Sequence, residues 1–176
     1  MVVNDATGST LVMSAGTQFT TTVNDLSYNF VTIGSNTISP IDNVYTFSNL
    51  KIYEGTYVNY QYTYDSTDVD QRFLIQSASA DVTTLTLQVQ NSSTDTVINT
   101  YTKATSITEL DSTSKVYFLQ EIENERYEIF FGDGIFGKKL EEGNFITINY
   151  ITCSGDSANG VNQFQFSGKL TYTRNS

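Results

Sequence analysis

Apolar and polar residues alternate with a period of two along much of this chain, a pattern that predicts β-strands. The clearest case is the stretch 58–64, in which one face carries Val58, Tyr60, Tyr62 and Tyr64 and the other carries Asn59, Gln61 and Thr63. The same alternation groups Leu85 with Leu87 and Val89, Ile146 with Ile148 and Tyr150, Phe164 with Phe166, and Leu170 with Tyr172. Shorter strands are predicted at 18–23, 28–33, 44–47, 72–75, 97–102 and 116–120.

Turn-forming residues separate these strands. Gly, Asn, Asp and Ser gather at 14–16, 34–36, 65–70 and 91–95, among other places, and each is a residue type that turns favour. One short helix-like turn is predicted near 107–112. So many short strands with so little helix predict an all-β fold of antiparallel β-sandwich or barrel-like modules.

The length of 176 residues suits one domain or two small ones. We expect a β-sandwich over residues 50–151 that ends with a glycine-rich hairpin. Residues 1–49 and 152–176 are expected to pair into a second, discontinuous β domain.

The glycine-rich segment lies between two strand-like runs, Tyr127–Phe131 and Phe145–Ile151. Glycine reaches positive φ without the steric cost that other residues meet, so a shaped turn between the strands is expected. The carboxylate of Asp133 is expected to accept hydrogen bonds from its own turn backbone, and Lys138 is expected to be solvated. We predict that Gly132, Asp133, Gly134, Gly137, Gly143, Asn159 and Gly160 define the shape of structural turns.

Two kinds of ligand site are alternatives to this structural interpretation. A phosphate cradle is disfavoured, because Lys139 follows Lys138 where a P-loop has Ser or Thr. Asp65, Asp68 and Asp70 are the best candidates for calcium ligands, since calcium takes several oxygen ligands. They lack the mid-loop glycine and the final glutamate of an EF-hand, so a solvated acidic loop is the favoured interpretation. No metal and no cofactor is predicted.

The amino-acid composition excludes or disfavours several classes of function. A net charge of −10 opposes binding to nucleic acid and to anionic membranes. The chain has no histidine, which excludes Ser-His-Asp and Cys-His catalysis within it, and Cys153 has no visible activating base. The N-terminal residues lack the pattern of a signal peptide, so assembly in a cytoplasm is expected. We predict that the protein is not an enzyme.

Several motifs together resemble a known family. FGDGIFGKKLEEGNFITINY at 131–150, followed by SANG at 157–160, is similar to the baseplate wedge proteins of T-even-like contractile phages and to the broader baseplate J-like family. Further matching pieces are LVMSAGTQFTTTV at 11–23, Phe-Val-Thr at 30–32, KIYEGTYVNYQY at 51–62, RFLI at 72–75 and TTLTLQVQ at 83–90. Since intact proteins of this kind are several times longer and partly helical, the chain is interpreted as a fragment or a minimal relative.

The resemblance implies a structural subunit of a baseplate wedge, located in the tail of the virion and assembled in the host cytoplasm. Its expected partners are other copies of itself and other wedge proteins, and its expected action is a rigid-body rearrangement of interfaces. No small-molecule substrate is expected. A carbohydrate-binding or adhesin-like β module remains the alternative, because exposed Tyr and Phe rings can stack on sugars.

Overall fold

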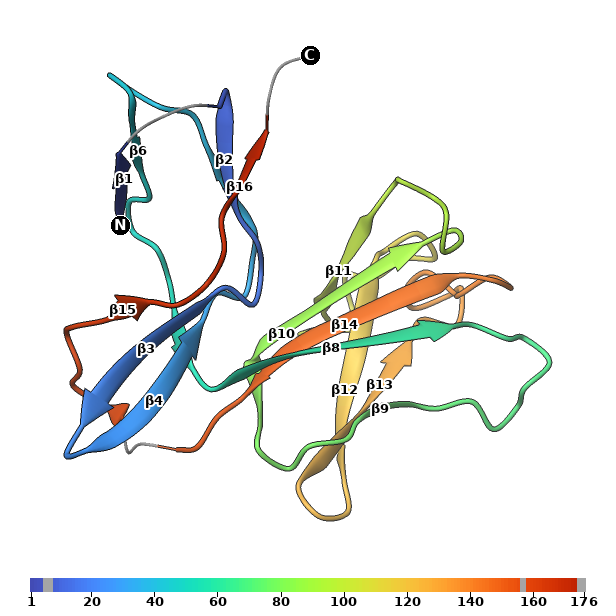
Figure 1. Cartoon of the computed structure of the whole chain (residues 1–176). Coiled ribbons are helices and arrows are strands. Elements are labelled where there is room, and N and C mark those ends of the chain that lie inside the picture. The colour runs from blue at the N-terminus through green and yellow to red at the C-terminus, as the bar shows by residue number, and fades with distance from the viewer. Residues whose placement is uncertain (5–7, 156–157, 174–176) are drawn as a thin grey trace. The chain divides into compact units, whose positions relative to one another are not determined.

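A computed structural model describes residues 1–4, 8–155 and 158–173, and it confirms that the chain is nearly all β (Figure 1). The chain divides into two compact units. The first unit comprises Met1–Val58 with Ile151–Ser176, and the second comprises Asn59–Tyr150. The described residues include no helix that is long and apolar enough to cross a membrane.

The second unit is built around a seven-stranded sheet. In spatial order the strands are β8 (Thr56–Thr63), β14 (Phe145–Thr152), β10 (Ala80–Gln90), β11 (Asn99–Lys103), β12 (Val116–Ile122), β13 (Arg126–Phe131) and β9 (Phe73–Ile75). The hydroxyl of Tyr62 on β8 donates to the carbonyl oxygen of Leu74 on β9 at 3.2 Å. This bond joins the first and last strands, so the sheet is nearly closed, like a barrel.

One strand pair in this sheet departs from the predicted antiparallel pattern. β11 and β12 run parallel, with Thr102 opposite Val116. A parallel neighbour requires a long connection, because the chain must return to the starting end before it pairs. Residues 104–115 make this return through turns, and the predicted helix-like turn near 107–112 is one of them.

Aromatic rings form a row of edge-to-face contacts in the second unit. The ring of Phe73 lies 5.4 Å from that of Tyr62 and 5.3 Å from that of Phe131, and Phe131 lies 5.8 Å from Tyr101. Such arrangements stabilise a core beyond the area that they bury. The buried apolar residues of the second unit include Ile75, Leu87, Val89, Ile129, Ile146 and Ile148.

The described residues of the first unit form three smaller sheets. β1 (Val2–Asn4) pairs with β6 (Val44–Thr46). A four-stranded sheet has the order β15 (Gln165–Phe166), β3 (Gln18–Val23), β4 (Leu26–Val31) and β7 (Tyr53–Glu54). A three-stranded sheet has the order β16 (Thr171–Thr173), β2 (Thr10–Met13) and β5 (Asn36–Ile38). Strands from the C-terminal part of the chain therefore pair with strands from its N-terminal part.

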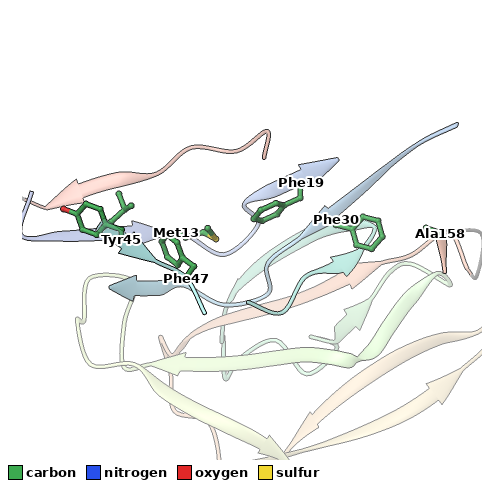
Figure 2. Close-up of a cluster of buried hydrophobic side chains, with 7 residues drawn as sticks. Met13, Phe19, Phe30, Tyr45, Phe47 and Ala158 are labelled. Carbon is green, nitrogen blue, oxygen red and sulfur yellow. The ribbon is translucent and has the colours of Figure 1, made fainter. Parts of the chain in front are cut away.

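Side chains from both parts of the chain form the core of the first unit (Figure 2). Its buried members are Leu11, Met13, Phe19, Phe30, Tyr45, Phe47 and Ala158. The fully buried Tyr45 donates its hydroxyl to the carbonyl oxygen of Gly8 at 2.7 Å, which satisfies its polar group.

The prediction of a glycine-rich hairpin is wrong in its pairing. β13 has β12 and β9 as neighbours, whereas β14 lies between β8 and β10. A strand has only two edges, and the pairing of β12 with β13 through a short turn at Asn124 and Glu125 occupies one of them. The glycine-rich segment is therefore a connection that crosses from one part of the sheet to another.

Candidate functional site

The glycine-rich connection is held in shape by its own backbone and by one carboxylate. Oδ1 of Asp133 accepts hydrogen bonds from the backbone N–H groups of Ile135 at 2.9 Å and Phe136 at 2.8 Å. These donors stabilise the charged form and lower the pKa of Asp133. The N–H of Gly134 donates to the carbonyl oxygen of Gly137 at 3.1 Å, which closes the turn. We call residues 132–139 the glycine loop.

Two positions in this loop require glycine for different reasons. A Cβ atom at Gly132 would lie 2.2 Å from the backbone of Gly137, which leaves no room for a side chain. Gly137 has a φ of 98°, and a Cβ atom there would lie 2.9 Å from Cγ2 of Val116. The loop therefore folds back on itself more closely than other residues allow.

A neighbouring turn provides a second anchor for the glycine loop. The N–H of Gly137 donates to the carbonyl oxygen of Asp111 at 2.9 Å, and the N–H of Lys138 donates to that of Ser114 at 2.8 Å. Oδ1 of Asp111 in turn accepts from the N–H and hydroxyl of Thr113, both at 2.8 Å, and from the hydroxyl of Ser114 at 2.9 Å. These bonds also lower the pKa of Asp111. The turn at 111–114 is thus fixed locally and holds the loop.

The tip of this restrained loop carries two apolar side chains in solvent. Ile135 is 67% exposed and Phe136 is 47% exposed. Adjacent large apolar side chains on a fixed backbone are typical of contact sites, because little conformational entropy is lost when a partner covers them.

A cavity of about 200 Å³ lies near the base of the loop, between the loop and strands β9 and β13. Its wall includes Arg72, Glu128, Phe130, Gly132 and Lys139. The guanidinium of Arg72 makes two hydrogen bonds to Glu128, Nε to Oε1 at 2.8 Å and a terminal nitrogen to Oε2 at 2.5 Å. The carboxylate of Glu128 is only 9% exposed, and the hydrogen bond from Arg72 lowers its pKa.

The ion pair between Arg72 and Glu128 connects two strands of the large sheet. Glu128 lies on β13 opposite Leu74 of β9, and Arg72 immediately precedes β9. The paired charges therefore hold the short strand β9 against β13.

Two carboxylates of the acidic loop at 65–70 accept hydrogen bonds from residues of the same loop. Oδ1 of Asp65 accepts from the N–H and hydroxyl of Thr67, at 2.9 and 2.6 Å, and Oδ1 of Asp68 accepts from the N–H of Asp70 at 3.0 Å. The bonds from Thr67 lower the pKa of Asp65. Within the described part of the chain, no three His, Cys, Asp or Glu side chains are grouped as metal ligands.

The remaining predicted turn residues lie apart from the glycine loop. Gly143 has a φ of 79° just before β14, and no neighbouring atom lies within 4 Å of the position that a Cβ atom would take. Asn159 and Gly160 belong to the first unit, where Gly160 has a φ of 87°. Ser157, which begins the SANG motif, lies outside the described residues. Cys153 is exposed.

Sequence reasoning missed two parts of this site. The anchoring turn at 111–114 was not singled out, although Asp followed by Ser, Thr and Ser is typical of such turns. The exposure of Ile135 and Phe136 was not predicted either. The sequence does contain a pattern that indicates this exposure. Ile135 and Phe136 are two large apolar residues between glycines, in a segment that cannot be a strand.

Comparison with known proteins identifies the family. Residues 56–160 match the family model described as bacteriophage baseplate wedge protein gp6, third domain. No curated protein matches the chain. The match spans more than half of the chain and includes the glycine loop, the ion pair of Arg72 with Glu128 and all seven strands of the large sheet. The chain therefore belongs to the family of the third domain of bacteriophage baseplate wedge protein gp6, a structural component of the phage tail baseplate.

Proposed function

We propose that this chain is a stiff structural subunit of a contractile-tail baseplate wedge, and that its glycine loop docks against a neighbouring subunit. The observation that carries this proposal is the exposure of Ile135 and Phe136 on a loop fixed by Asp133 and Asp111. Buried apolar anchors in prearranged positions contribute most of the binding energy at many protein interfaces.

The partners are other copies of this chain and other wedge proteins of the same phage. Tail contraction then changes the contacts between such subunits while each β unit moves as a rigid body. A nearly closed sheet with an aromatic core suits this role, because it resists deformation under load. The net charge of −10 favours partners with basic surfaces and disfavours nucleic acid and anionic membranes.

In this proposal the subunit assembles in the host cytoplasm before the tail is complete. This location suits a structural protein that functions by binding other proteins. In this proposal the two units, 1–58 with 151–176 and 59–150, act as separate β domains. The division into a sandwich at 50–151 and a discontinuous domain at 1–49 and 152–176 stays a prediction. The predicted turn residues act by shape, and no cofactor takes part.

The test is assembly from purified components. The double variant Ile135→Ser with Phe136→Ser is mixed with the wedge proteins of the same phage, and complex formation is followed by analytical ultracentrifugation. We expect binding weaker by about thirtyfold, which corresponds to the loss of one anchor of about 2 kcal/mol.

Val69→Ser is the matched control, since Val69 is 92% exposed on another loop of the same unit. It should assemble as the unaltered chain does. Equal assembly of the double variant and the unaltered chain would contradict the proposal.

A further inference from the structure

The pairing of β15 with β3 in the first unit stops early. Gln165 lies opposite Thr20 and Phe166 opposite Phe19, and the N–H of Ser167 donates to the carbonyl oxygen of Gln18 at 3.1 Å. β3 itself continues to Val23. The chain before β15 therefore leaves the edge of β3 while that strand still runs on.

The backbone direction along β3 follows from these bonds. In an antiparallel pair, the N–H and C=O groups of alternate residues point to the same neighbour. Gln18 bonds toward the β15 side, so Thr20 and Thr22 point there as well. The carbonyl oxygen of Thr17 accepts from the N–H of Thr32 on the β4 side at 3.1 Å, which agrees with this alternation. The N–H and C=O of Thr22 thus point beyond the end of the β15 ladder.

A groove lies at this place. It consists of two adjoining hollows, of about 320 and 300 Å³, which share Thr21, Thr22 and Gln163 in their walls. One wall is β3 from Thr20 to Val23, and the other is the segment 159–165. No charged residue is among the described residues that line it, and most of the lining residues are Thr, Asn or Gln.

We propose that this groove receives an extended polypeptide segment of a neighbouring baseplate subunit, which adds a strand beside Thr20–Val23. The proposal rests on the assembly role proposed above and names a second contact for it. Strand addition to an exposed sheet edge uses main-chain hydrogen bonds for affinity and side-chain pockets for specificity. The backbone groups of Thr22 supply the hydrogen bonds, and the uncharged walls select a segment rich in Ser, Thr and Asn.

A sugar is the other ligand that uncharged polar walls suggest. The aromatic ring in this wall, Phe164, packs edge-to-face with Phe30 at 4.9 Å and is 39% exposed. An outward-pointing pair of backbone groups on a strand edge matches a peptide backbone better than a sugar ring. The observations therefore favour a strand.

Hydrogen exchange at the amide of Thr22 tests the proposal without any substitution. The exchange rate is compared between the isolated chain and the assembled wedge. We expect exchange at least about tenfold slower in the wedge, because the amide gains a main-chain partner. Thr20, which already lies within the β15 ladder, should exchange slowly in both states.

A variant that fills the groove gives an independent readout. Gln163 is exposed, so Gln163→Trp should fold normally and should prevent the slowing at Thr22. Ser93→Trp, at an exposed loop position of the second unit, is the matched control and should leave the slowing unchanged.

The results also separate this proposal from the one on the glycine loop. An equal exchange rate at Thr22 in both states overturns strand addition, even where the Ile135 and Phe136 variant fails to assemble. Slowing at Thr22 that survives loss of the loop contact supports strand addition alone. Binding of the isolated chain on a glycan array, with slowing at Thr22 caused by the bound glycan, would overturn the peptide assignment.

Discussion

Gly132 and Gly137 approach so closely that a Cβ atom on Gly132 would lie 2.2 Å from both the carbonyl carbon and the carbonyl oxygen of Gly137. The two glycines lie at the two ends of a short loop segment, and Ile135 and Phe136 within this segment are exposed to solvent. Their approach, with the bonds to Asp133, explains how a loop without regular secondary structure can present apolar side chains in one position.

Gly132→Ala should destabilise the protein by about 3 kcal/mol, because the methyl group would overlap the backbone of Gly137. Gly143→Ala is the matched comparison. Its φ of 79° strains alanine, but no atom lies within 4 Å of the added Cβ, so we expect a cost of about 1 kcal/mol. Urea denaturation measures both values. Equal costs would show that close approach is not what requires glycine at position 132.

Asp111→Ala should loosen the glycine loop without unfolding the unit. The substitution removes the acceptor that fixes the turn at 111–114, and the N–H groups of Gly137 and Lys138 bond to this turn. Hydrogen exchange at these two amides should become at least about tenfold faster, as expected for local opening. Asp111→Asn keeps an acceptor oxygen and should change less. Unaltered exchange in Asp111→Ala would mean that the loop is held by other contacts.

Acid should weaken the contact between β9 and β13. The hydrogen bond from Arg72 lowers the pKa of Glu128 in the folded protein, so the pair contributes stability above the unfolded pKa of about 4.3. That contribution is lost as the pH falls through the folded pKa. Stability measured from pH 7 to pH 2 should therefore fall less steeply in Glu128→Gln than in the unaltered protein.

Arg72→Gln provides the complementary measurement. It leaves the poorly exposed carboxylate of Glu128 without its cationic partner, and the pKa of Glu128 should rise. The midpoint of acid unfolding should then move to higher pH. Identical acid midpoints for all three proteins would exclude a stabilising role for the ion pair.

Core truncations test whether the two units unfold as separate domains. Leu11 is fully buried in the first unit and Leu87 in the second. Each Leu→Ala change should cost about 3 kcal/mol. If the units unfold separately, Leu11→Ala lowers one thermal transition and Leu87→Ala the other. A single transition that both variants shift equally would contradict separate domains.

The all-β class was predictable because alternation is a local property of the sequence. The strand at 18–23 was predicted with the bounds that β3 has, and its paired turn at Asn24 and Asp25 has the positive φ angles that tight hairpins need. Four strands, β1, β2, β5 and β7, were not predicted. They have four residues or fewer. The strands β6, β9, β15 and β16 are equally short and were predicted, so length alone does not explain the difference.

Which strands pair with each other was harder to predict from the sequence. The hairpin predicted around the glycine loop failed because adjacent strands in sequence need not be neighbours in a sheet. The pairing of β13 with β9 brings Glu128 together with Arg72, which lies 56 positions earlier in the chain. Contacts of that separation leave no periodic signal. The same holds for the groove beside Thr22, since it depends on where the chain before β15 leaves β3.

The most direct test of the central claim is an electron cryo-microscopy map of the phage baseplate that contains this chain, at a resolution that shows side chains. Our account predicts that a neighbouring subunit covers Ile135 and Phe136 and that the glycine loop keeps the conformation described above. A map in which both side chains face solvent would contradict the proposed assembly role of the loop.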